Sequence, residues 1–133
     1  MAYWICRSEP DVYGWDDLVA DKETLWDGVR NYAARNFLKQ MRPGDEIIFY
    51  HSNKGKEAVG IMAVTGDWQP DGEDGKWAKV PVKPVRKLAR PITLDEIKRD
   101  KLLGKMEMVR QSRLSVTPVK PKEWERLLEL AAS

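Results

Sequence analysis

The segment EIIFYHS, residues 46–52, constrains the fold of this chain more than any other. It is rich in β-branched and aromatic residues, which favours a strand. Apolar residues occupy both alternating faces, and a strand of this kind lies inside a sheet rather than at its edge. We therefore expect residues 46–52 to form an interior strand.

Four further segments have the composition of strands, and two of them carry residues that disturb a regular ladder. Gly60 predicts a bulge or a close approach of another group. Pro81 and Pro84 predict an edge strand or a bulged one, because proline donates no ladder hydrogen bond. A turn-rich loop, QPDGEDGK, separates these two strands. The four predicted strands are residues 2–7, 58–68, 77–88 and 113–119.

Helical patterns lie between these strands. Asn31 is a plausible N-cap of a helix that runs to Met41, and Thr93 with Glu96 forms a capping-box pattern for a helix that begins near Leu94. The last helix begins at Pro121 and carries one apolar stripe. This stripe consists of Trp124, Leu127, Leu128 and Ala131. Short helices are also expected after Asp16 and around residues 104–111.

These elements predict an α+β fold. Strands occur in at least five short pieces, and the helices between them differ in length, so the regular alternation of a doubly wound sheet is missing. A curved mixed sheet or small barrel with flanking helices fits this order best. The 133 residues suffice for a single domain with one real core, spanning 1–133.

Composition restricts the class of protein. One cysteine and one histidine cannot build an internal disulfide or a four-ligand zinc site, so we expect neither a structural metal nor a cofactor. No apolar run approaches the ~20 residues of a membrane span. The N-terminus lacks the layout of a signal peptide. We expect a protein without a membrane partner, cytoplasmic in a bacterium or nuclear in a eukaryote.

The net charge of +2 hides an asymmetry along the chain. Residues 1–75 carry 8 Lys/Arg against 14 Asp/Glu, whereas residues 76–113 carry 12 against 4. A segment with this excess of cations suggests a basic face for a polyanion. Alternatively, the two segments neutralise one another in the folded protein.

The sequence offers little for catalysis, and we predict no catalytic residue. His51 and Ser52 are adjacent on a predicted strand, so their side chains point to opposite faces and cannot pair as base and nucleophile. No nucleophile elbow, phosphate loop or dinucleotide fingerprint is present. The carboxylates of Glu9, Asp27 and Asp45 show no spacing that singles out an acid–base pair.

Four clusters combine rings or guanidinium groups with short hydrogen-bonding side chains at predicted strand or helix ends. They are RSEP (7–10), WDGVRNYAARN (26–36), FYHSN (49–53) and RLS (113–115). Strand ends meet at the mouth of a curved sheet, so we expect the clusters to converge there. Such a mixture suits a planar heterocycle, because rings stack on it, amides and hydroxyls bond its edge, and arginine contacts its phosphate.

Each of these residues also has a structural interpretation. Trp26 precedes a turn signal, which favours a ring facing a pocket over a core position. Asn31 serves equally as a helix cap or a ligand contact. Arg30 and Arg35 bind a ligand or pair with the acidic half of the chain. The remaining tryptophans considered, Trp4, Trp68 and Trp124, are most simply core residues.

At these four clusters the sequence resembles the EVE domain, of the PUA-like superfamily. The resemblance extends from Tyr3-Trp4 to the PKEW segment at 121–124. It implies a PUA-like mixed β-barrel of five to six strands with peripheral helices, and a relation to YTH domains. It further implies a reader of modified bases, either modified cytosine in DNA (5-methylcytosine or 5-hydroxymethylcytosine) or a modified RNA base. The positions that match the family's pocket are Ser8, Glu9, Trp26, Arg30, Asn31, Tyr32, Arg35, Asn36, Tyr50, His51, Ser52, Arg113 and Ser115.

Two departures from the family pattern concern the site. The family usually has lysine where Arg7 stands, which keeps the charge and changes the geometry. It usually has glutamine where Ala34 stands, so any contact made by that glutamine is missing here.

The resulting hypothesis is a monomeric, non-enzymatic nucleic-acid-binding module. A flipped or single-stranded base would stack on Trp26, with Tyr50 or Tyr32 as a second wall. Its edge would be read by Asn31, Ser8 and Ser52. The phosphate or sugar would be bound by Arg30, Arg35 and Arg113, and the cations of residues 76–113 would track the backbone. The alternatives are a nuclease-like enzyme that uses Glu9 or His51, and a sensor of small nucleotides.

Overall fold

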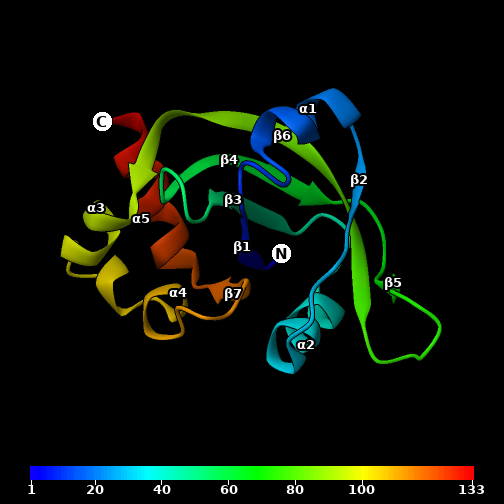
Figure 1. The fold of residues 1–133 in the computed structure, drawn as a ribbon. Helices are drawn as coiled ribbons and strands as arrows, with labels where there is room; N and C mark the ends of the chain where they lie inside the picture. The colour runs from blue at the N-terminus through cyan, green and yellow to red at the C-terminus, as the bar shows by residue number, and fades with distance from the viewer.

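Seven strands form one mixed sheet in the computed structural model, which describes residues 1–133 (Figure 1). The strands are β1 (Tyr3–Ser8), β2 (Thr24–Trp26), β3 (Glu46–His51), β4 (Glu57–Val64), β5 (Gln69–Pro70), β6 (Ala78–Thr93) and β7 (Val116–Val119). The helices are α1 (Trp15–Asp21), α2 (Tyr32–Gln40), α3 (Leu94–Arg99), the 3-10 helix η1 (Leu103–Lys105), α4 (Glu107–Arg110) and α5 (Pro121–Ala132).

The strand order is β2-β6-β4-β3-β1-β7, and β5 pairs with β6 beside this path. Only β1 and β3 run parallel to one another, and every other pair is antiparallel. The long strand β6 arches over the sheet and pairs with β4, β2 and β5, so the sheet curls into a half-barrel (Figure 1). β2 and β7, at the two ends of this order, do not pair with one another, so the barrel does not close. The fold thus has the PUA-like character predicted, with seven strands in place of five or six.

The interior position of β3 is confirmed. It lies between β1 and β4, and Ile47, Ile48, Phe49 and Tyr50 are all buried. Ile47 and Phe49 belong to one hydrophobic cluster, whereas Ile48 and Tyr50 belong to another, as the alternation of a strand requires. Both faces of the sheet are therefore covered.

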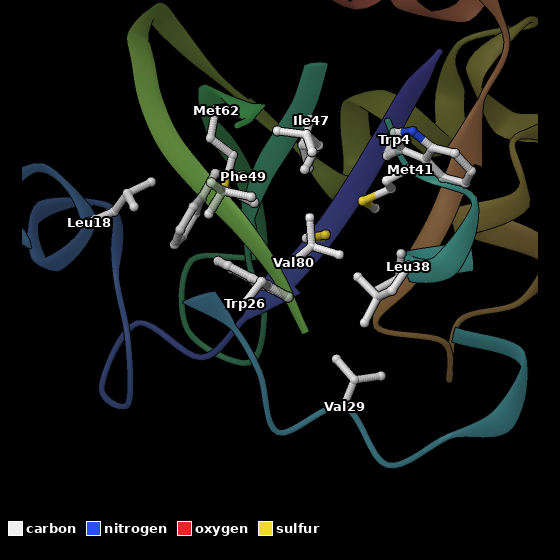
Figure 2. Close-up of a cluster of buried hydrophobic side chains, with 14 of the residues drawn as sticks. Trp4, Leu18, Trp26, Val29, Leu38, Met41, Ile47, Phe49, Met62 and Val80 are labelled. Carbon is white, nitrogen blue, oxygen red and sulfur yellow. The ribbon is translucent and has the colours of Figure 1, made fainter. Parts of the chain in front are cut away.

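The first cluster lies inside the curl of the sheet. Figure 2 shows Trp26, Phe49 and Val80 close together, with Leu38 of α2 on the other side of Val80. The second cluster lies on the opposite face of the sheet and is covered by α3, η1, α4 and α5. Its largest contributions from α5 are Trp124 and Leu127.

Gly60 explains how α1 docks on the sheet. A Cβ atom at this position would lie 2.5 Å from the ring of Trp15. The ladder also shifts register next to Gly60, against both β3 and β6. The close approach and the bulge predicted at this glycine are therefore both confirmed.

The predicted helix starts are confirmed by their caps. Thr93 Oγ1 accepts from the amide of Glu96, and Glu96 Oε1 accepts from the amide of Thr93. Asn31 Oδ1 accepts from the amide of Ala34 at the start of α2. Pro121 begins α5.

Trp68 corrects one expectation. It was predicted as a core residue, but it is 36% exposed and lies under the ammonium group of Lys39, 4.6 Å from its ring centroid. Strand β4 ends at Val64, four residues before the predicted end, so Trp68 falls in the connection to β5. Trp4 and Trp124 are buried as predicted.

Candidate nucleic-acid interface

A cavity of about 550 Å³ lies where the sheet stays open, between β2 on one side and the ends of β1 and β7 on the other. Residues of three separate segments come together here because the curl of the sheet brings its two edges near one another. The cavity is lined by Arg7, Ser8, Val12, Tyr13, Thr24, Leu25, Trp26, Asp27, Gly28, Val29, Arg30 and Ser115.

Trp26 forms part of the wall and part of the core. Its indole meets the ring of Phe49 edge-on at 5.4 Å and the ring of Tyr13 edge-on at 6.4 Å. Only 8% of its surface is exposed, and it lines the cavity. Trp26 is therefore held by the packing of the core cluster (Figure 2) and also lines the cavity.

Hydrogen bonds fix the wall on the β1 side. Ser8 Oγ donates to the carbonyl of Tyr13 at 2.6 Å, so the hydroxyl oxygen remains available as an acceptor. The guanidinium of Arg7 donates to the carbonyls of Met108 (2.7 Å) and Ser112 (2.5 Å). Since Arg7 also lies over the ring of Tyr50 at 5.6 Å, it joins β1 to the segment before β7. Burial lowers the pKa of Arg7.

Asp71 fixes the wall on the β2 side. Its Oδ2 accepts from the amide of Gly28 and from Nη1 of Arg30, both at 2.9 Å. The Gly28 hydrogen bond, followed by that of Arg30, holds the pKa of the Asp71 carboxyl below its usual range. The β5–β6 connection therefore anchors residues 28–30, which border the cavity.

Arg30 also begins a stack of four side chains beside the cavity. Its guanidinium lies 5.3 Å from the Trp77 ring, which stacks on Tyr32 at 5.0 Å. The guanidinium of Arg35 lies 4.9 Å from the Tyr32 ring centroid. Tyr32 remains 56% exposed and takes part in this surface stack rather than in the cavity wall.

The structure brings four of the thirteen predicted site residues into the cavity wall: Ser8, Trp26, Arg30 and Ser115. The α2 residues lie outside it. Asn31 caps the helix, Tyr32 belongs to the stack, and Arg35 donates to Asn36 Oδ1 and to the carbonyl of Lys76. The ion pair of Arg30 with Asp71 matches the alternative that this arginine pairs with the acidic half.

The other five predicted residues lie apart from the cavity wall. Tyr50 is buried in the second core, and burial raises its pKa. His51 Nε2 accepts from the amide of Trp15 and borders a smaller cavity of about 300 Å³. Glu9 is exposed and accepts from Asn53 Nδ2, Ser52 donates its amide to the carbonyl of Ser8, and Arg113 is exposed near Ser115.

Several residues at the cavity were not predicted as site residues. Arg7 and Asp27 belong to two of the four sequence clusters, but Asp27 was considered only as a member of an acid–base pair. Tyr13 and Thr24 lie in segments without a recognisable pattern, so no local signal identifies them. Asp71 reaches Arg30 across 41 positions of the sequence, which only the fold reveals.

The basic segment is not neutralised by ion pairs with the acidic one. Six ion pairs occur, and none joins a cation of residues 76–113 to an acid of residues 1–75. Within the basic segment, only Arg90 and Arg110 are paired, each with a glutamate of the same segment. The remaining cations of residues 76–113 are available to a polyanion.

The family follows from the comparison of the whole chain. The family model described as EVE domain matches residues 2–130. The chain belongs to the EVE domain family. Thymocyte nuclear protein 1 of Mus musculus, to which it is similar, is 36% identical over 96% of this chain and 73% of its own length.

Solved structures agree with this assignment. Rpa0253 from Rhodopseudomonas palustris is similar with a TM-score of 0.94 and 39% identity, over 99% of this EVE domain chain and 94% of that protein. Human THYN1 protein, in complex with DNA that contains 5-methylcytosine, has a TM-score of 0.92 and 32% identity, over 100% and 99% of the two chains.

A YTH domain shares the fold alone. The YTH domain of the MRB1 protein of Zygosaccharomyces rouxii has a TM-score of 0.64 and 9% identity, over 98% and 86% of the two chains. The predicted structural relation to YTH domains is therefore confirmed. No helix is both long enough and apolar enough to span a membrane.

Proposed function

We propose that this EVE domain, residues 1–133, binds nucleic acid and holds a modified base, 5-methylcytosine in DNA, in the cavity between Trp26 and Ser115. The observation that carries the proposal is the cavity itself. Its volume of about 550 Å³ lies within the roughly 300–1,000 Å³ of small-molecule sites. A rigid indole borders it, and hydroxyl and guanidinium groups surround the opening.

The wall combines the two kinds of group that a methylated pyrimidine needs. Trp26, Val12 and Leu25 offer apolar surface to the ring and its methyl group. Ser8, Ser115 and Arg30 offer acceptors and donors to the polar edge. The similar human THYN1 protein, crystallised with DNA that contains 5-methylcytosine, supports this ligand.

Phosphate binding is assigned to cations at and beyond the opening. Arg30 borders the cavity with half of its side chain exposed, and Arg113 is exposed beside Ser115 on the opposite side. The unpaired cations of residues 76–113 add a sequence-independent contribution that falls with salt. Arg35 is less suited to this role, because all three of its guanidinium nitrogens already donate within the protein.

The proposal describes a binding module rather than an enzyme. His51 and Glu9, the residues considered for a nuclease, lie outside the cavity, and His51 Nε2 is engaged by the Trp15 amide. No group of His, Cys, Asp and Glu side chains is arranged to hold a metal ion. Cleavage of a labelled oligonucleotide that is abolished by His51→Ala would contradict this part of the proposal.

Fluorescence anisotropy with matched oligonucleotides tests the function. The DNA and RNA probes, single-stranded and duplex, differ only in one cytosine, which is unmodified, 5-methylated or 5-hydroxymethylated. We expect the 5-methylcytosine DNA to bind tighter than the unmodified DNA. Equal affinities for all probes would refute base reading by this domain.

Two variants connect the binding to the cavity. Trp26→Phe keeps an aromatic ring in the core while shrinking the wall, and it should reduce the preference for the modified base. Arg30→Gln changes a half-exposed side chain, so the fold should persist while affinity for every probe falls. Lys122→Gln, on the exposed surface of α5 and outside residues 76–113, is the matched control and should leave the preference unchanged.

A further inference from the structure

The methyl group of 5-methylcytosine does not by itself distinguish this base from thymine. Thymine carries the same methyl group on the same ring and is present throughout DNA. The two bases differ at position 4, where 5-methylcytosine has an amino donor and thymine has a carbonyl acceptor. A cavity that recognised only the ring and the methyl group would bind thymine as well. The proposed function therefore requires a protein acceptor directed at position 4.

Asp27 is the one carboxylate among the residues that line the cavity. The hydroxyls in the wall both donate and accept, and the guanidinium groups of Arg7 and Arg30 only donate. A hydroxyl therefore suits either base, the guanidinium groups favour the carbonyl of thymine, and the carboxylate is the side-chain group that favours the amino donor of 5-methylcytosine. Asp27 is exposed and takes part in no ion pair, so its oxygens are free to accept from a ligand.

The backbone of Asp27 is held from both sides. Trp26, which precedes it, pairs with Val80 in the β2–β6 ladder. Gly28, which follows it, adopts a φ of 76° and donates its amide to Asp71. The positive φ favours glycine, and it completes the turn that places Asp27 beside the indole of Trp26. The carboxylate is therefore carried on a fixed segment of the wall.

We propose that Asp27 is the specificity-determining residue that separates 5-methylcytosine from thymine. The Asp27 carboxylate accepts a hydrogen bond from the amino group at position 4 of the base. It repels thymine, because two acceptors would face one another without a proton between them. The inference rests on the proposed function and adds to it the group that reads the base identity.

The test measures the affinity ratio between two single-stranded DNA oligonucleotides that carry 5-methylcytosine or thymine at one position. The wild-type domain is expected to prefer 5-methylcytosine at least about tenfold, as one base-edge contact provides. Asp27→Asn is expected to bring the ratio close to one, because the asparagine amide can both donate and accept. The control is Asp67→Asn, which removes the same charge from an exposed aspartate away from the cavity, and it should keep the wild-type ratio.

The outcomes separate this inference from the proposed function. If Asp27→Asn keeps a wild-type ratio while the domain still prefers 5-methylcytosine to cytosine, Asp27 does not read the base and the function stands. If the wild type binds 5-methylcytosine and thymine equally, and both more tightly than cytosine, the site reads the methyl group alone and the inference is overturned. Equal binding of all three bases would remove the proposed function and, with it, the role of Asp27.

Discussion

Replacing Gly60 with alanine tests the packing of α1 against the sheet, through Trp15. The added Cβ would lie 2.5 Å from Cζ3 and 2.6 Å from Cε3 and Cη2 of Trp15. Carbon atoms in contact lie about 3.5–4.0 Å apart, so the indole or the strand must move by about 1 Å. Overpacking of this kind costs about 1–3 kcal/mol, a large part of the roughly 5–15 kcal/mol that stabilises a small domain.

The indole has little freedom to move away from the new methyl group. Trp15 is 5% exposed, meets the ring of Phe49 edge-on at 5.6 Å, and donates its backbone amide to His51. Phe49 in turn contacts Trp26. A displaced Trp15 would therefore disturb the packing that supports the cavity wall, so the alanine variant should also weaken oligonucleotide binding.

A double-mutant cycle in urea identifies the cause. The clashing atoms belong to the six-membered ring of the indole, so Trp15→Phe should relieve the overlap with alanine at position 60. We expect the double variant to be more stable than the sum of the single effects by about 1 kcal/mol. Strict additivity, or a Gly60→Ala variant within about 0.5 kcal/mol of the wild type, would refute the reasoning.

Three further predictions concern side chains with defined partners. Asp71→Asn should lower the free energy of unfolding by about 1 kcal/mol, because the charge-assisted hydrogen bond from the Gly28 amide weakens and the ion pair with Arg30 is lost. Urea unfolding measures this loss, and an unchanged midpoint would contradict the prediction. Burial lowers the pKa of His51, and the charges of Glu57 and Asp16 oppose this effect. The unfolded chain therefore takes up the proton at a higher pH than the folded protein does. The free energy of unfolding should be fully retained above pH 6.5 and should decline as the pH falls through the lowered pKa. Unfolding curves between pH 7 and 5.5 should show this decline in the wild type and a smaller one in His51→Gln, since the chain has no other histidine; parallel slopes would contradict it. Thr93→Ala should cost about 1 kcal/mol through loss of the α3 cap, whereas Thr93→Ser should cost much less; equal losses in thermal unfolding would show that the hydroxyl is not responsible.

Local patterns were sufficient to predict most of the secondary structure. The two-sided apolar run of β3, the cap at Asn31 and the capping box at Thr93 each depend on neighbouring residues, so the sequence displays them directly. Strands β2 and β5 escaped prediction because three and two residues are too few to form a periodic pattern. Their existence depends on pairing with β6, which the tertiary fold provides.

The candidate site was predicted less completely for a related reason. The cluster WDGVRNYAARN is visible in adjacent residues of the sequence, but the structure places only part of it in the cavity wall. Tyr32 of this cluster instead stacks on Trp77, 45 positions away in the sequence. The sequence also shows that Trp26 lies at a bend, but it does not show that Tyr13 meets it edge-on. Contacts between distant segments decide which members of a motif border the cavity.

The indole Nε1–H resonances of the six tryptophans test the central claim most directly. In ¹H–¹⁵N spectra, the Trp26 signal can be assigned from its loss in Trp26→Phe. Titration with 5-methylcytosine DNA should shift the Trp26 signal while that of Trp124, buried in the other core, stays in place. Unmodified DNA of the same sequence should leave Trp26 nearly unchanged. If the modified DNA instead moved only the signals of Trp68 or Trp77, the base would not enter this cavity.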